Sequence, residues 1–211
     1  MNVRVVRRYA SAALLPLLLT ACAALPSGTA PGTPTPADVA ARSIHESIEL
    51  SGRLSVRYQS NGRDEALHGS FTWKQTPVLT TVTLLSPLGQ TIAVIEVGPH
   101  GATLAQAGQA IRTAASVDEL TANTLGWPLP VSGLKDWLQG FAATADGVPF
   151  RATPENAEVT TQDGWHIRFA NWLANDATSG ALRPRRIDLT RNTEQAGDVS
   201  IRIVIDTWQP L

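Results

Sequence analysis

Cys22 is the residue whose type and surroundings point most clearly to a chemistry. Three arginines within the first eight residues precede an apolar run at 10–19, which ends at Leu19-Thr20-Ala21-Cys22. A basic start, an apolar stretch and small residues at its end are typical of a secretory signal. The order leucine, small, small, cysteine fits the bacterial lipobox, in which the thiol is acylated with diacylglycerol and the chain is cut before it. We therefore expect 1–21 to be a signal peptide and Cys22 to carry lipid.

The alternative for Cys22 is a chance thiol inside an ordinary secretory signal. It is the only cysteine in the sequence, which excludes an intramolecular disulfide, although an exported protein meets an oxidising compartment. A free exported thiol is a liability and a thioether is not, which favours lipidation. The apolar run is about half of the ~20 residues that span a bilayer, so we expect no retained transmembrane helix.

Charge excludes one class of partner. The chain carries 17 basic and 18 acidic residues, a net charge of −1, and loss of 1–21 leaves 14 basic and 18 acidic residues, a net charge of −4. An acidic domain lacks the basic footprint that nucleic-acid binding needs. The compact basic cluster Arg183, Arg185 and Arg186 fits a solvated strand end better than the alternative, a contact with an acidic carrier or with lipid head groups. We expect no nucleic-acid partner.

Catalytic and metal-binding motifs are missing from the sequence. It contains no Gly-x-Ser-x-Gly and no Gly-x-x-x-x-Gly-Lys, and His45-Glu46 lacks a second histidine at the spacing of zinc proteases. The four histidines, at 45, 68, 100 and 166, show no metal-ligand spacing. We expect a protein that is not an enzyme, with no metal and no cofactor.

Composition divides the chain after residue 37. Residues 24–37 are dominated by Pro, Thr, Gly, Ser and Ala, which form no core and favour a semi-extended tether. The remaining 38–211 suits a single domain by length, and hydrophobic residues make up 43% of the chain, enough for a core. We expect three parts: the signal 1–21, the lipidated Cys22 with its tether up to 37, and one domain at 38–211.

Period-2 alternation dominates this domain. Apolar and polar residues alternate at 50–58 and again at 199–206, as they do in half-buried antiparallel strands. Noisier runs of the same kind occur at 69–74, 80–85, 91–97, 101–105, 111–114, 158–161, 165–172 and 185–191. About ten strands in a meander predict one large curved sheet or barrel.

Helical signals are few. Ser116 and Glu119 form a capping box that predicts a helix ending at Gly126. The spacing of Leu134, Trp137, Leu138 and Phe141 predicts a second helix with one apolar face. A third helix is expected around 38–48. Amphipathic helices over the concave face of an open sheet leave an apolar chamber, but the same pattern also fits a solid core, and patterning leaves both readings open.

Eight short segments carry a resemblance to a known family. They are Gly52-Arg53-Leu54-Ser55-Val56, Gly69-Ser70-Phe71-Thr72-Trp73, Leu85-Ser86-Pro87-Leu88-Gly89-Gln90-Thr91, Leu125-Gly126-Trp127-Pro128-Leu129-Pro130-Val131, Leu134-Lys135-Asp136-Trp137-Leu138-Gln139-Gly140, Asp163-Gly164-Trp165-His166-Ile167, Pro184-Arg185-Arg186-Ile187 and Ile201-Arg202-Ile203-Val204-Ile205-Asp206-Thr207-Trp208. Together with the lipobox, their order and spacing over nearly the whole mature chain resemble the LolB family of outer-membrane lipoprotein receptors.

The resemblance implies a fold and a function. The fold is mainly β with α, an unclosed antiparallel β half-barrel lidded by short helices around an apolar cavity. The function is to accept triacylated lipoproteins from the periplasmic carrier LolA and to insert them into the inner leaflet of the outer membrane, without a cofactor and as a monomer. Ala23 agrees with an outer-membrane location, because Asp after the lipidated Cys commonly retains a lipoprotein at the inner membrane.

The resemblance also assigns roles to residues. The turn Pro87, Leu88 and Gly89 corresponds to a loop with a protruding leucine that engages the membrane; the alternative is a Leu88 folded back onto the sheet. The candidate cavity walls and lid are Leu54, Val56, Phe71, Val82, Leu84, Ile95, Leu134, Trp137, Leu138, Phe141, Ile203 and Ile205.

Other functions remain open at this point. A lipoprotein of related shape would carry phospholipid, glycolipid or a signalling ligand instead of lipoproteins. An anchored hydrolase with dispersed catalytic residues is the third class, and the sequence offers no titrating pair for it.

Overall fold

The computed structural model describes residues 42–60, 62–127, 129–174 and 182–211. The predicted signal peptide at 1–21, Cys22 and the tether up to residue 37 lie outside these residues. Within them, no helix is both long enough and apolar enough to cross a membrane.

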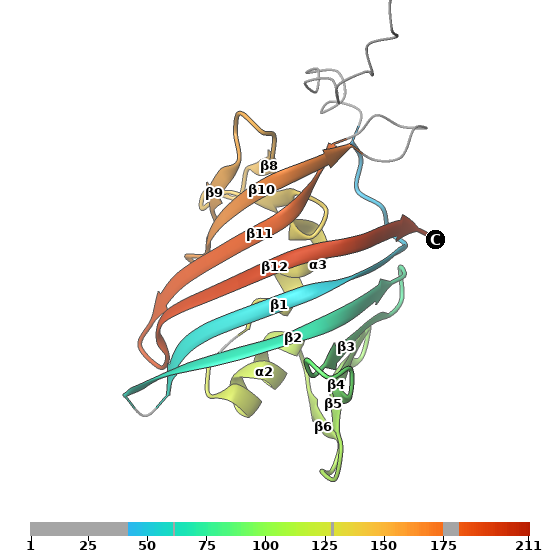
Figure 1. The fold of residues 1–211 in the computed structure, drawn as a ribbon, viewed down its shortest axis with the longest axis vertical. Helices are drawn as coiled ribbons and strands as arrows, with labels where there is room; N and C mark the ends of the chain where they lie inside the picture. Colours follow the sequence, from blue (N-terminus) through green and yellow to red (C-terminus); the bar gives the residue numbers. More distant parts are fainter. Residues whose placement is uncertain (1–41, 61, 128, 175–181) are drawn as a thin grey trace, which may run out of the picture. The chain divides into compact units, whose positions relative to one another are not determined.

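A ten-stranded antiparallel sheet dominates the described residues (Figure 1). Its strand order is β6-β5-β4-β3-β2-β1-β12-β11-β10-β9. The strands are β1 (Ile48–Ser60), β2 (Arg63–Gln75), β3 (Thr80–Leu85), β4 (Thr91–Gly98), β5 (Gly101–Gln106), β6 (Arg112–Ala114), β9 (Glu158–Thr160), β10 (His166–Ala174), β11 (Leu182–Thr193) and β12 (Gly197–Pro210). Because β6 and β9 stand at opposite ends of this order, the sheet is open, which confirms the unclosed antiparallel fold. Every predicted strand segment overlaps an observed strand.

The first and last strands pair in the middle of the sheet. Leu54 of β1 lies opposite Ile203 of β12, and Val56 lies opposite Ile201. A register shift between Ser51 and Gly52 adds one residue to β12 at this point. Such a bulge bends the strand and increases its twist, so the sheet curves and acquires a concave face.

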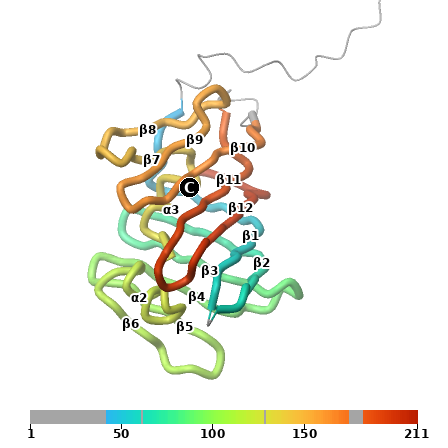
Figure 2. The backbone as a smooth tube through the Cα atoms, turned by 90° about the vertical axis from the view of Figure 1, so that its left-hand side faces the viewer, coloured from blue at the N-terminus to red at the C-terminus, as the bar shows by residue number. Residues whose placement is uncertain are grey.

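Two helices occur in the described residues, and both lie on one side of the sheet (Figures 1 and 2). Helix α2 (Val117–Leu125) begins as predicted, because the Ser116 hydroxyl accepts a hydrogen bond from the Glu119 amide at 3.1 Å. It ends at Gly126, whose φ of 82° is a left-handed conformation that glycine adopts without steric cost. Helix α3 is Val131–Trp137.

The second helix is shorter than its apolar pattern predicts. Gly140 has a φ of 78°, which ends the helical turn, and Phe141 begins strand β7 (Phe141–Ala143). This strand pairs with β8 (Pro149–Arg151) in a separate two-stranded sheet that sequence patterning missed. The assignment of Phe141 to the helix was wrong. The helical spacing of Leu134 and Phe141 says nothing about the backbone between them, where Gly140 takes a left-handed conformation that ends the helix.

The third predicted helix, around 38–48, is also wrong for the residues that the structure describes. Residues 42–47 are not helical, and Ile48 already belongs to β1. The buried Arg42 holds this segment in place by donating hydrogen bonds to the carbonyls of Leu182 and Ala152, both at 2.6 Å, and of Gly140 at 3.1 Å. Burial lowers the pKa of Arg42 to about 10, so its guanidinium remains charged at neutral pH.

Gly52→Ala should destabilise the domain by about 1–3 kcal/mol, the usual cost of overpacking. A Cβ at position 52 would overlap the backbone carbonyl of Val204, which has little freedom to move at the bulge. Urea denaturation checks this. The control is Gly98→Ala, whose Cβ would meet the Val78 carbonyl oxygen at an ordinary 3.9 Å and should change stability by less than about 0.5 kcal/mol. Equal effects of the two substitutions would contradict the steric argument.

Candidate apolar binding cavity

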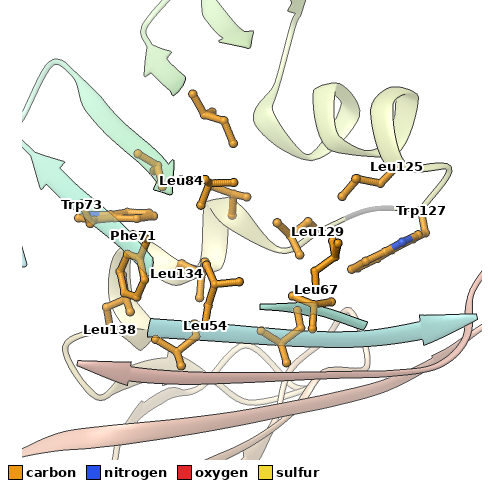
Figure 3. Close-up of a pocket in the computed structure, with 16 residues that line it drawn as sticks. Leu54, Leu67, Phe71, Trp73, Leu84, Leu125, Trp127, Leu129, Leu134 and Leu138 are labelled. Atoms are coloured by element: carbon orange, nitrogen blue, oxygen red, sulfur yellow. The ribbon is translucent and has the colours of Figure 1, made fainter. Parts of the chain in front are cut away.

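A cavity of about 160 Å³ lies between the sheet and the helices (Figure 3). Its lining consists of apolar and aromatic residues from both sides. The strands contribute Leu54, Val56, Leu67, Phe71, Trp73, Val82, Leu84, Ile95, Ile201 and Ile203. The helical region contributes Leu125, Trp127, Leu129, Val131, Leu134 and Leu138.

The sheet side of the cavity follows from strand alternation. Successive side chains of a strand point to opposite faces, and cross-strand neighbours share a face. Phe71 pairs with Leu84 across β2 and β3, and Trp73 pairs with Val82. The register therefore assembles residues far apart in sequence into one continuous apolar wall.

Nine of the twelve residues selected from the sequence lie in this lining. They are Leu54, Val56, Phe71, Val82, Leu84, Ile95, Leu134, Leu138 and Ile203. The structure brings them together around one space.

The other three residues selected from the sequence lie outside the lining. Trp137 is buried, but its ring packs against Gly133 of its own helix. The Phe141 ring lies 5.0 Å from the guanidinium carbon of Arg42. Ile205 is part of the buried core without reaching the cavity. The apolar face of a helix or strand extends beyond the cavity. Residues that share such a face therefore do not all reach the cavity.

Seven lining residues were missed by sequence reasoning. They are Leu67, Trp73, Leu125, Trp127, Leu129, Val131 and Ile201. Strand alternation could have identified three of them, Leu67, Trp73 and Ile201. Each lies an even number of residues from a correctly predicted lining residue on the same strand, so its side chain points to the same face. The connection between α2 and α3 has no periodicity that would have revealed Trp127 or Leu129.

The mouth of the cavity lies between β2 and the end of α2. Leu67 and Leu125 both line the cavity, yet they remain 48% and 38% exposed. Large apolar side chains that are both lining and exposed mark the place where the cavity reaches solvent. Figure 3 shows Trp127 beside these two leucines, and its ring packs on Tyr58 with centroids 5.6 Å apart.

Hydrogen bonds join the two helices into one lid, defined here as residues 117–138. The Asp118 carboxylate in the first turn of α2 accepts hydrogen bonds from the backbone amide and the hydroxyl of Ser132 in α3. The Thr121 hydroxyl accepts a hydrogen bond from the Leu129 amide at 3.1 Å. These contacts hold α2, α3 and their connection together.

The cavity has no titratable side chain in its lining. The Nε1 of Trp73 donates to Gln75 Oε1 at 3.2 Å, which satisfies the indole. Burial raises the pKa of Asp136, and burial together with Arg183 lowers the pKa of His45, but neither residue lines the cavity. Among the described residues, no three potential ligands gather in a metal site. The lining can hold hydrocarbon by exclusion of water.

The turn between β3 and β4 presents Leu88 to solvent. The Gly89 amide donates to the Ser86 carbonyl at 2.9 Å, and the φ of Gly89 is 80°. Pro87 restricts the first central position of this turn. The Leu88 side chain is 87% exposed, which excludes the alternative that it folds back onto the sheet.

A family profile described as outer membrane lipoprotein LolB matches residues 46–208. The chain belongs to the LolB family. The outer-membrane lipoprotein LolB of Cupriavidus taiwanensis is 41% identical over 93% of this chain and 94% of the relative. That of Cupriavidus necator is 42% identical over 92% and 93%, and that of Thiobacillus denitrificans is 34% identical over 96% and 98%.

Solved structures resemble the chain more distantly. A LolA superfamily protein from Nitrosomonas europaea aligns with a TM-score of 0.46 at 12% identity, over 82% of this chain and 90% of that protein.

Leu134→Trp should plug the cavity of this LolB-family chain. An indole on α3 would enter the existing space, so the binding of a fluorescent fatty acid should weaken by roughly tenfold or more. Stability should fall by less than the roughly 1–3 kcal/mol that overpacking of a filled core costs. Fluorescence titration and urea denaturation measure the two effects. The control is Val148→Trp, at a 57% exposed side chain outside the lining. Undiminished binding by Leu134→Trp would place the fatty acid elsewhere.

Proposed function

We propose that this chain is a lipid-anchored receptor at the periplasmic face of the outer membrane. It accepts triacylated lipoproteins from a LolA-like carrier and inserts them into the inner leaflet, acting as a monomer. The observation that carries the proposal is the apolar cavity under the lid, in a chain of the LolB family. A cavity without titratable groups suits the binding and release of acyl chains, not the chemistry of a hydrolase.

Transfer between two apolar cavities explains why no energy source is needed at this step. Burying acyl chains contributes about 0.8 kcal/mol per CH₂ group, so the exposure of three long chains to water would be prohibitive. Passage from the carrier cavity into the lined cavity of this chain nearly cancels that cost. The difference in affinity between the two proteins then sets the direction.

The cavity must widen to accept acyl chains. Its volume of about 160 Å³ is close to that of an engineered cavity that holds benzene, about 150 Å³. Pockets for larger ligands are about 300–1,000 Å³. The lid lies over the space and its α2 end borders the mouth at Leu67 and Leu125. Displacement of the lid at this mouth enlarges the cavity without breaking the sheet.

Leu88 serves the delivery step. Its exposed side chain at a turn gains about 1.5–3 kcal/mol by entering hydrocarbon, enough to bring the domain to the bilayer without locking it there. Lipid on Cys22 keeps the domain at the membrane, and a segment as long as residues 24–37 would span roughly 40 Å at ~3 Å per residue if it took the polyproline form. The domain can then stand clear of the membrane to meet its carrier or tilt onto it.

Cys22→Ala should abolish lipidation and leave the domain folded. The described residues, which begin at 42, contain the hydrophobic core and do not include position 22. Metabolic labelling with a radioactive fatty acid measures the first effect, and thermal unfolding of the purified domain measures the second. Incorporation of label by the variant would show that the lipobox assignment is wrong.

Leu88→Glu should preserve receipt of cargo and lower its delivery by roughly tenfold or more, since a carboxylate opposes the 1.5–3 kcal/mol gain of a buried leucine. The soluble variant is loaded from a LolA-like carrier, mixed with liposomes, and the cargo that floats with the liposomes is measured. The control is Val78→Glu, at a 71% exposed residue before β3, which should deliver normally. Normal delivery by Leu88→Glu would refute the proposal that Leu88 serves the insertion of cargo into the membrane and not its receipt from the carrier.

A further inference from the structure

We propose that a basic groove on the outer face of the sheet binds the phosphate of anionic phospholipid head groups while Leu88 is inserted. The groove has a volume of about 390 Å³ and is bordered by Arg53, His68, Ser70, Pro87 and Arg202. This inference rests on the proposed role of Leu88. It adds a second contact with the bilayer, specific for head-group charge.

The groove lies on the sheet face opposite the cavity. Arg53 alternates with Leu54 on β1, and Arg202 alternates with Ile203 on β12. The leucine and isoleucine line the cavity, so the arginine side chains point to the other face. Lipid at the groove therefore does not compete with cargo in the cavity.

The position of Pro87 links this groove to the membrane-inserting turn. Pairing between β2 and β3 ends at Ser70 and Leu85, and the turn leaves the sheet there. A Cβ at Gly69 would overlap the Leu85 carbonyl, so this glycine lets the two strands approach closely beside the turn. Because Pro87 borders the groove and precedes Leu88 directly, insertion of Leu88 into hydrocarbon brings the groove to head-group level.

Four arginines share two aspartates around the groove. Asp206 accepts two hydrogen bonds from Arg53, both at 2.9 Å, and lies 3.9 Å from Arg185. Asp188 pairs with Arg202 at 2.6 Å and with Arg186 at 3.1 Å. These six residues carry two positive charges in excess, on a chain whose net charge is −1. Around the groove, the arginines therefore outnumber the aspartates that pair with them.

The chemistry of these arginines suits a phosphate. The side chains of Arg53 and Arg202 are 63% and 59% exposed, so their remaining N–H groups are accessible. Guanidinium groups bind phosphate oxygens through paired hydrogen bonds. An acidic protein surface would also be attracted, but contact with Pro87 favours the bilayer that receives Leu88.

The test places a fluorescent reporter at the turn. In the lipidated protein the sulfur of Cys22 is blocked, so Gln90→Cys, at an exposed residue two positions after Leu88, supplies a single thiol for the environment-sensitive dye NBD and leaves Leu88 in place. The protein is reconstituted into vesicles of phosphatidylcholine alone or mixed with phosphatidylglycerol. We expect stronger NBD emission in the mixed vesicles, and loss of this difference at high salt because screening weakens exposed charges.

Removal of the groove arginines should weaken this response. Arg53→Gln with Arg202→Gln should lower the ratio of inserted to free reporter by roughly tenfold in mixed vesicles, as each basic residue near an anionic surface contributes to binding. In this double variant Asp206 still pairs with Arg185, and Asp188 still pairs with Arg186. The fold should therefore persist, and thermal unfolding of the variant checks this. The control is Arg57→Gln with Arg63→Gln, two exposed arginines of the β1–β2 hairpin, and it should respond like the parent.

Each contrary result has its own meaning. Equal emission in the two vesicle types, or an unchanged response after loss of Arg53 and Arg202, overturns the head-group proposal and leaves the role of Leu88 intact. Normal insertion with impaired receipt of cargo from the carrier also overturns it, because the groove then serves an acidic protein. Absence of NBD response in every vesicle refutes insertion of the Pro87–Gly89 turn itself, and this inference with it.

Discussion

The structure depends on one constraint: an open, curved sheet cannot bury its concave face against itself. Strands β6 and β9 stand at opposite ends of the strand order, so the apolar side chains of that face are covered by α2, α3 and their connection. The helices do not fill the space, and a void of about 160 Å³ remains. A void forfeits dispersion contacts, and such a loss is tolerated where function requires an accessible space.

The way in which the lid is attached determines where this space opens. Gln139, which follows α3, is buried and exchanges hydrogen bonds with the backbone of His45. The Arg42 side chain adds a second link by donating a hydrogen bond to the Gly140 carbonyl. These contacts fasten the α3 end of the lid to the segment that enters β1. The α2 end contacts β5 and the short edge strand β6, and α2 ends with the exposed Leu125. The mouth is therefore at the less firmly held end.

Strand alternation separates the two tasks of the sheet. One face supplies hydrocarbon-compatible walls, and the other supplies a charged surface in which Arg53 and Arg202 share aspartates with neighbouring arginines. A one-residue slip of register would exchange the faces. The bulge at Ser51 and Gly52 bends the pair of strands β1 and β12. On either side of it the pairing is kept, since Leu50 lies opposite Trp208 and Leu54 lies opposite Ile203.

The sequence by itself determined the strands of the large sheet, the limits of α2 and the family, because alternation, capping and turn chemistry are local and are written in adjacent residues. It also selected most of the sheet wall. Tertiary structure alone decided that Phe141 starts a strand after Gly140 and that Trp137 folds onto Gly133. It likewise decided that residues 42–47 are not helical and that distant carbonyls bind the side chain of Arg42. It also decided that a space remains at all, since a solid core and a chamber share one hydrophobic pattern and differ only in the distance between lid and sheet.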